Sequence, residues 1–238
     1  MSLRALAGTE AIRLLRGWKA SAYLALSSVL AVVTVVILGT GGPNQETPMQ
    51  NMAIIWPFVC LQLIFCLTIF ASDSFSSDAS RGTLQLYILL PQSRLKVLLA
   101  KLVVPVIFFY AGLAIFSVAF TFIQYPAGFW KLWAAMMGID SLLFLALLFS
   151  TVLVSIVLKG GGASALVSSV LMLYLFIWPF QTAATYGNVN PFFVGASVMR
   201  DIWDGALDAP TPLASTCLMA VMGLVLCYFA LSRKEVPE

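Results

Sequence analysis

Asp140 is the residue of this chain whose chemical type and surroundings point most directly to a functional role. It is the only charged residue that we place within a long apolar segment away from the ends of that segment. A carboxylate at membrane depth is costly and by default indicates an ion path, a proton relay or a substrate contact. Either Asp140 is buried about a third of the way into a span over 132–158, or residues 127–139 lie along the interface. Because 141–158 alone supplies about enough apolar residues for a crossing, we favour the interfacial arrangement, with the span beginning just after Asp140.

The other reactive side chains offer no catalytic, cofactor-binding or metal-binding set. The chain has no histidine, which removes the commonest general base and metal ligand. Its four cysteines lie inside apolar runs without Cys-x-x-Cys spacing and are predicted to be packing residues. Serines on the apolar segments lack an activating base and are predicted to hold helices together; they are Ser150, Ser155, Ser168 and Ser169. No Gly-x-x-x-x-Gly-Lys-Ser/Thr loop is present, so we expect no enzyme activity from this chain alone.

Composition places the chain among membrane proteins. Hydrophobic residues make up 61% of its 238 residues and charged residues only 10%, and the mean hydropathy is +0.98. Soluble domains contain far more charge. We therefore predict a single transmembrane domain over 1–238 in contact with the lipid bilayer, and no nucleic acid partner.

Six apolar runs are long enough to cross a bilayer as helices. They cover about 20–38, 52–71, 98–123, 132–158, 163–180 and 213–231. The predicted fold class is an all-α membrane protein with six transmembrane helices.

Residues 1–19 predict an amphipathic helix that lies in the membrane interface. Its basic and aromatic anchors are Arg13, Arg16, Trp18 and Lys19, with the basic face turned toward anionic headgroups. A cleaved signal peptide is the competing interpretation, but the run over 20–38 is long for a signal core and 39–43 is a poor cleavage site.

The distribution of basic residues predicts which side each loop faces. With both termini in the cytoplasm, all of the thirteen Lys and Arg residues except Lys131 and Arg200 fall on the cytoplasmic side. Such an excess is the positive-inside pattern, so a multi-pass protein of the cytoplasmic membrane with both termini inside is predicted. Lys101, near the inner end of its span, is able to extend its ammonium group toward the headgroups.

A polar segment from Ser72 to Lys96 interrupts the apolar pattern between the second and third spans. It contains a turn signal at Gly82 and a helical run, 83–89, that Thr83 can cap and Pro91 closes. The segment is predicted to be cytoplasmic and to hold a short helix. The alternative is a solvated loop that merely connects two spans.

These features resemble the permease subunit of type-2 ABC exporters. The resemblance rests on the layout, on Arg81-Gly82-Thr83-Leu84-Gln85 with 90–94 after it, and on a pattern in the last outer loop. That pattern consists of Asn190, Pro191 and Phe192 followed by Arg200 and Gly205. The family often carries glutamate on either side of the glycine–threonine–leucine stretch, where this chain has Ser80 and Gln85.

The resemblance implies two separate cytoplasmic ATPase subunits and a second permease copy or paralogue. ATP and Mg²⁺ would be bound by the partner ATPase, and this chain would carry no cofactor. A coupling helix would contact the ATPase through Arg81, Gly82, Thr83, Leu84, Gln85, Leu86 and Tyr87. A re-entrant outer segment between the fifth and sixth spans would gate the exit through Asn190, Pro191, Phe192 and Arg200.

Two other functions stay open at this point. One is a haem-export permease of cytochrome maturation, which has a similar size and span count. The other is a non-transporting membrane subunit that scaffolds a larger complex, which would explain why polar residues are scarce within the spans.

Overall fold

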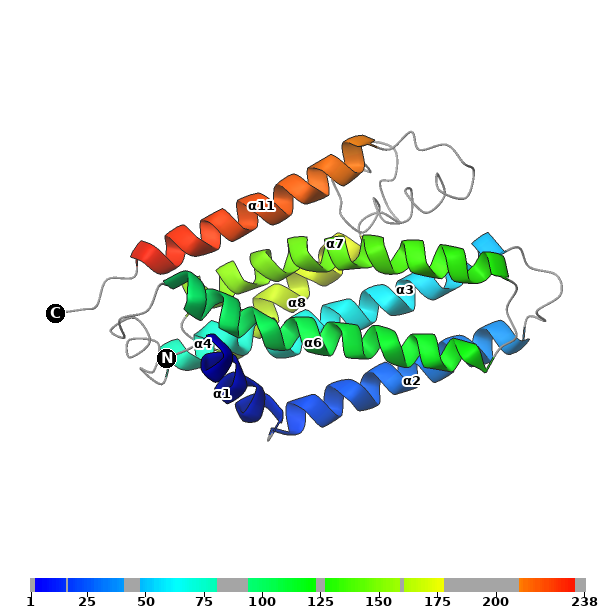
Figure 1. Ribbon diagram of the computed structural model, residues 1–238, viewed down its shortest axis with the longest axis horizontal. Helices are drawn as coiled ribbons and strands as arrows, with labels where there is room; N and C mark the ends of the chain where they lie inside the picture. Colours follow the sequence, from blue (N-terminus) through cyan, green and yellow to red (C-terminus); the bar gives the residue numbers. More distant parts are fainter. Residues whose placement is uncertain are drawn as a thin grey trace.

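The apolar runs of the sequence form long helices that pack side by side. The computed structural model describes residues 3–15, 17–40, 48–80, 94–122, 127–158, 161–177 and 210–233. Every regular element in these ranges is helical, which confirms the predicted all-α class. The long helices extend side by side along the length of the bundle, and α1 (Leu3–Leu15) is set at an angle to them at one end (Figure 1).

Four helices in the described ranges are long and apolar enough to cross a membrane. They are α2 (Trp18–Thr40), the run that begins with α3 (Pro48–Cys66), α6 (Arg94–Thr121) and α7 (Ala127–Val157). Two shorter apolar helices accompany them, α8 (Gly161–Ile177) and α11 (Pro210–Arg233). The chain is therefore a multi-pass membrane protein by length and composition, with a helix at each of the six predicted spans.

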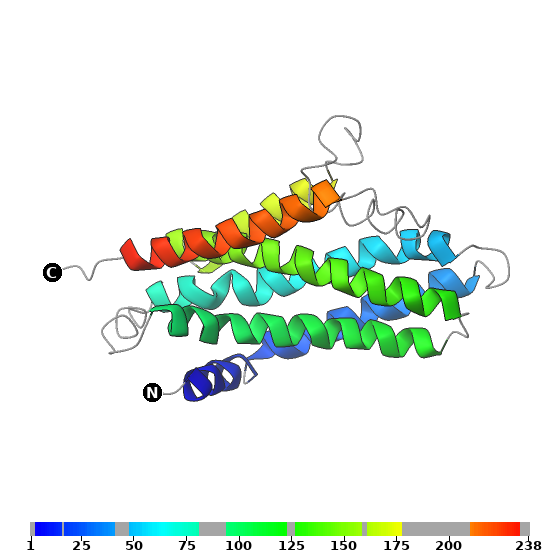
Figure 2. The same ribbon diagram turned by 45° about the horizontal axis from the view of Figure 1, so that its top comes forward.

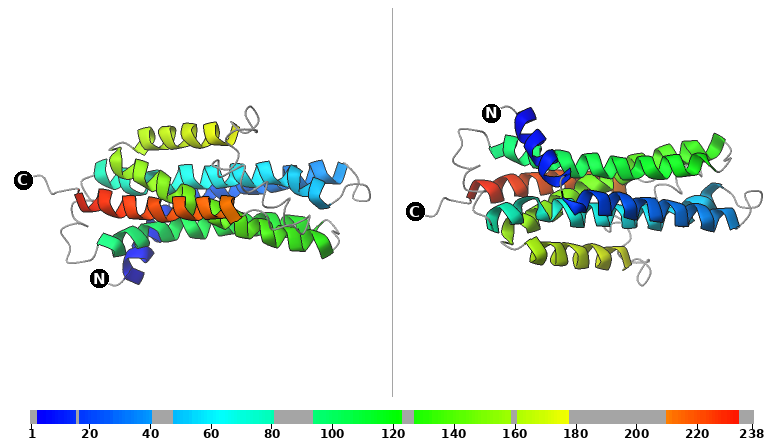
Figure 3. Two further views of the ribbon diagram at one scale, coloured as in Figure 1. Left: turned by 90° about the horizontal axis from the view of Figure 1, so that it is seen from above. Right: turned by 90° about the horizontal axis from the view of Figure 1, so that it is seen from below.

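Consecutive long helices run in opposite directions along the bundle. The start of α1, the end of α11 and the helix α4 (Asp73–Ser80) all lie at the same end (Figures 1 and 2). The view from above shows α8 on one side of the bundle and α1 on the other (Figure 3). This antiparallel order is the one that the prediction of six crossings requires.

Helix α7 contradicts the interfacial arrangement favoured for Asp140. The helix continues without a break through 31 residues, and Asp140 is the fourteenth of them. Its side chain is 0% exposed. If residues 127–139 lay along the interface, a separate helix would begin after them, near Asp140. Instead, packing against other helices encloses one continuous helix and the Asp140 carboxylate in the bundle.

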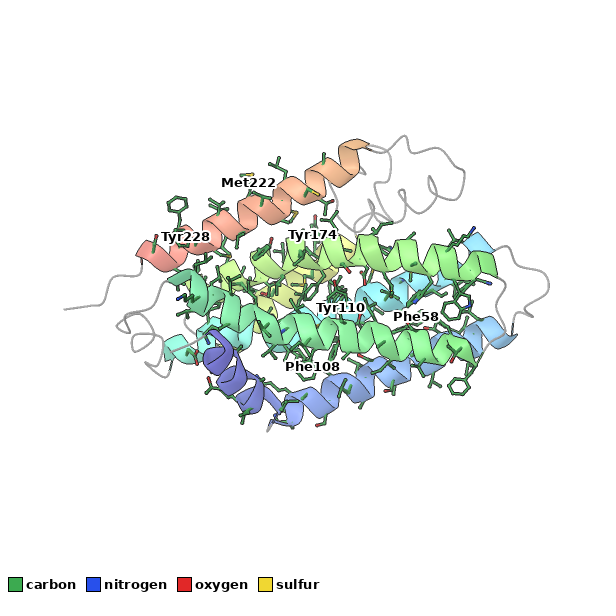
Figure 4. All side chains as sticks on the ribbon, in the orientation of Figure 1. Phe58, Phe108, Tyr110, Tyr174, Met222 and Tyr228 are labelled. Carbon is green, nitrogen blue, oxygen red and sulfur yellow. The ribbon has the colours of Figure 1, made fainter. Side chains whose placement is uncertain are left out.

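The outer surface of the bundle is apolar, as expected for a surface in contact with lipid. On α11, Met222 and Tyr228 point away from the other helices (Figure 4) and are 54% and 44% exposed. On the inner side, Phe108 of α6 stacks on Phe70 with ring centroids 4.3 Å apart. Because lipid tails are as apolar as these side chains, close packing and hydrogen bonds must hold the helices together.

Gly223 allows α11 to approach α7 closely. A Cβ atom at this position would lie 2.8 Å from Cβ of Phe149 on α7, an atom that cannot move without the backbone. Gly223→Ala is therefore expected to lower the free energy of unfolding by about 1–3 kcal/mol, because the methyl group forces the two helices apart. Titration with a denaturing detergent in mixed micelles measures this change.

Gly138→Ala is the matched control, because Gly138 also lies within a long helix and a Cβ atom there meets nothing within 4 Å. Equal losses in the two variants would show that the contact with Phe149 does not limit the packing of α11.

Candidate functional site: the polar end of the bundle

The second predicted span does not end where the polar segment begins. Helix α3 passes through a π-helical turn, η1 (Leu67–Ala71), and continues as α4. The N–H of Ser72 donates to the carbonyl oxygen of Leu67 at 3.0 Å, five residues back, as in a π-bulge. The first part of the segment predicted as a cytoplasmic loop is therefore helical, and Ser72, Ser76 and Asp78 are buried in the bundle. Hydrogen bonds and ion pairs to other helices make this burial possible.

Asp78 on α4 is enclosed by two cationic side chains from two other helices. The Arg13 guanidinium of α1 donates to Oδ1 of Asp78 at 2.5 Å, and the Lys101 ammonium of α6 donates to Oδ2. The side chains of Asp78 and Lys101 are each only 2% exposed, whereas that of Arg13 is 31% exposed. We call Arg13, Asp78 and Lys101 the ion triad. It joins α1, α4 and α6 at one end of the bundle.

The ion triad corrects the predicted position of Lys101. Lys101 does not extend toward the headgroups, because its ammonium group pairs with Asp78 and lies 5.3 Å from the ring centroid of Phe75. Arg13 pairs with the same carboxylate, and its role as an anchor at the headgroups stays a prediction. A buried charge is stable only when it is paired and hydrogen-bonded, and Asp78 provides that partner for both cations.

Serine side chains attach α4 to α7 and α8. Ser155 Oγ of α7 accepts hydrogen bonds from the backbone N–H groups of Phe75 and Ser76, at 3.2 and 3.0 Å. Ser164 of α8 donates its hydroxyl to the carbonyl oxygen of Ser72. The π-helical turn breaks the regular hydrogen-bond pattern, so the first N–H groups of α4 need acceptors from outside the helix.

The predicted packing role of the serines is confirmed for two of the four. Ser155 bonds α4, and Ser169 Oγ of α8 lies 3.1 Å from Oγ1 of Thr68 on η1. Ser150 bonds only the carbonyl oxygen of Ala146 on its own helix among the contacts described. Ser168 is buried, and its hydroxyl has no partner within the described residues.

The other predicted site residues are not brought together in the described ranges. Trp18 and Lys19 open α2, where Trp18 is 76% exposed. Arg16 lies outside the described residues. The predicted coupling residues, Arg81 to Tyr87, and the predicted outer gate, 190–192 with Arg200, lie outside them too.

The pairing within the ion triad was missed from the sequence, although two signals for it were present. Asp78 follows Ala71 and Phe75 at helical spacing, so it continues the buried stripe of the preceding helix. Lys101 stands between the apolar residues Leu98 and Leu102, which are also buried. A cation placed among core residues requires a counter-ion nearby.

The arrangement links helices through ion pairs and hydrogen bonds, and among the described residues it offers no nucleophile with an activating base. Among the described residues no group of three or more His, Cys, Asp or Glu side chains is placed to hold a metal ion. Comparison of the chain with models of known families and with curated proteins finds no match in either case. The function must therefore be argued from the site itself.

Proposed function

We propose that this chain is the transmembrane permease subunit of an ATP-driven exporter of the type-2 ABC kind. It would form the substrate pathway as a dimer and be coupled to two separate cytoplasmic ATPase subunits that bind ATP and Mg²⁺. The observation that carries this proposal is the ion triad. Asp78 lies just before the segment 81–93, and α6 resumes just after that segment, at Arg94. A force applied to 81–93 therefore reaches α4 and α6 together.

The ion triad would pass that movement to α1. Arg13 on α1 bonds the same carboxylate as Lys101 on α6, so displacement of Asp78 pulls on two helices at once. The hydrogen bonds from α4 to Ser155, and from Ser164 to Ser72 just before α4, extend the connection to α7 and α8. Packed helices linked in this way move as rigid bodies rather than bending individually. We propose that the movement alternates access to a pathway between two permease copies.

One cavity in the described part of the bundle is too small to serve by itself as a substrate pathway, which fits a pathway formed between two copies. A cavity of about 60 Å³ lies between α7, α8 and α11 and is lined by residues that include Thr151, Ser168 and Met219. This volume holds no more than a few waters and is far too small for a lipid-linked, polypeptide or drug cargo. The same observation fits a membrane scaffold that transports nothing, which is the second candidate function. A haem-export permease is a variant of the first candidate function, the exporter permease.

Replacing 82–89 by a flexible glycine–serine linker of equal length tests the proposal. We expect the variant to remain in the membrane but to lose the ATPase subunit that co-purifies with the wild-type chain, and with it ATP hydrolysis in liposomes. The control places the same linker at 40–47, which covers the last residue of α2 and the residues up to the start of α3.

Unchanged ATPase binding and ATP hydrolysis after replacement of 82–89 would disprove the coupling role. A wild-type chain that co-purifies with other membrane subunits but with no ATPase would favour the scaffold.

A further inference from the structure

Asp140 is a second polar site, separate from the ion triad and unused by the proposed coupling. Both of its carboxylate oxygens are buried and lack a hydrogen-bond donor among the described residues. The nearby hydroxyl of Ser141 is occupied, because it donates to the carbonyl oxygen of Met137 and accepts from Tyr110 of α6 at 3.1 Å. Tyr110 lies between α6 and α7 (Figure 4).

No described cation neutralises this carboxylate. Lys101 is bound to Asp78, and Lys131, nine positions before Asp140 on α7, is exposed. The ionisable groups on the helices around α7 do not hydrogen-bond Asp140. Those with described side chains are Cys60 and Cys66 on α3, Asp78 on α4, Lys96, Lys101 and Tyr110 on α6, Tyr174 on α8, and Cys217, Cys227 and Tyr228 on α11. The two α3 cysteines lie within electrostatic range of the carboxylate, but thiols carry no positive charge.

The surroundings contain an excess of hydrogen-bond acceptors. Gln62 Oε1 of α3 is another buried oxygen without a donor among the described residues. The amide nitrogen of Gln62 donates to the carbonyl oxygen of Phe109 at 3.3 Å, and the Phe109 ring stacks on Phe144, one turn after Asp140. Gln62 and Asp140 therefore lie at a similar level of the bundle. The missing component at this level is a donor or a cation.

We propose that Asp140 is a proton-binding site in the core of the bundle and carries its proton in the conformation described here. The proton bonds to one carboxylate oxygen, no electrons are transferred and no group leaves. The product is a neutral carboxylic acid, which supplies one donor and removes the buried charge.

A proton fits this position better than a metal ion. A divalent cation needs several oxygen ligands, and no group of three or more His, Cys, Asp or Glu side chains among the described residues is placed to hold a metal ion. The backbone carbonyl groups of α7 are engaged in an unbroken helix. Release of the proton would require water or a cation to reach Asp140, so a change in helix packing at α7 would control the protonation state.

Infrared spectroscopy of the full chain in liposomes tests the proposal. The protein is labelled with aspartate carrying ¹³C at the side-chain carboxyl carbon. At neutral pH we expect the carbonyl band of a protonated carboxylic acid, shifted to lower wavenumber by the label. Asp140→Glu is expected to keep a protonated-acid band without the isotope shift, because glutamate is unlabelled. Asp140→Asn is expected to lose the band completely.

Two results would overturn the proposal. One is the absence of any isotope-shifted band of a protonated carboxylic acid in the wild-type protein at neutral pH, and this measurement does not depend on the folding of any variant. The other is loss of that band on addition of sodium chloride but not of choline chloride, which would assign the site to a sodium ion.

Discussion

Asp78→Asn is expected to lower the free energy of unfolding by about 3–5 kcal/mol, because it leaves the buried ammonium group of Lys101 without a counter-ion. The Lys101 side chain is only 2% exposed and cannot recover water without moving α6. The partly exposed Arg13 guanidinium contributes less, since solvent already reaches it. Titration with a denaturing detergent in mixed micelles gives the change in free energy.

A second substitution separates loss of charge balance from general damage at this position. In the variant that combines Asp78→Asn with Lys101→Met, no unpaired ammonium group is buried. We expect it to regain most of the stability lost by Asp78→Asn alone, as buried ion pairs replaced by apolar groups often do. If the double variant is no more stable than Asp78→Asn alone, the pairing of Lys101 with Asp78 does not account for the lost free energy of unfolding.

Gly112→Ala is expected to lower the free energy of unfolding by about 2–4 kcal/mol. A Cβ atom on Gly112 of α6 would overlap the amide group of Gln62 and lie 2.5 Å from the Tyr23 hydroxyl oxygen of α2. The Gln62 amide would have to leave its hydrogen bonds to Tyr23 and to the Phe109 carbonyl oxygen. The cost combines overpacking with unpaired buried polar groups.

Gly138→Ala again serves as the control, because it changes the same atoms in an open position on a long helix. The combined variant Gly112→Ala with Gln62→Ala offers a second test. It removes the amide that the new methyl group meets. Its loss in free energy of unfolding should therefore be smaller than the sum of the losses in Gln62→Ala and Gly112→Ala. Simple additivity of the two effects would show that Gln62 does not occupy the space next to Gly112.

The apolar runs were sufficient to predict the helices. They did not predict the positions that polar residues take in the folded bundle. The predicted span 20–38 became α2, Trp18–Thr40, with small changes at the ends. For 52–71 the prediction stopped at the first polar residues, yet the helical run continues to Ser80. Serine and aspartate read as loop residues by type, and their partners, Ser155, Lys101 and Arg13, lie far away in sequence.

Asp140 is a residue whose importance the sequence indicated but whose burial it did not predict. Its type marked it as a candidate functional residue, but length alone could not decide between an interfacial segment and one long helix. The choice depends on whether neighbouring helices cover residues 127–139, and α7 buries Phe129 and Trp133 against Phe120 of α6. Such packing between separate segments leaves no signal in hydropathy.

The sequence by itself determined that this protein is helical, lies in a membrane and contains few groups capable of chemistry. In hydrocarbon every backbone polar group must be hydrogen-bonded within the protein. A long apolar run in a membrane therefore forms a helix. Only the tertiary structure decided that Asp78 holds α1, α4 and α6 together and that Asp140 is buried without a described partner. Those outcomes depend on which distant side chains meet, and burial makes each meeting, or its absence, energetically decisive.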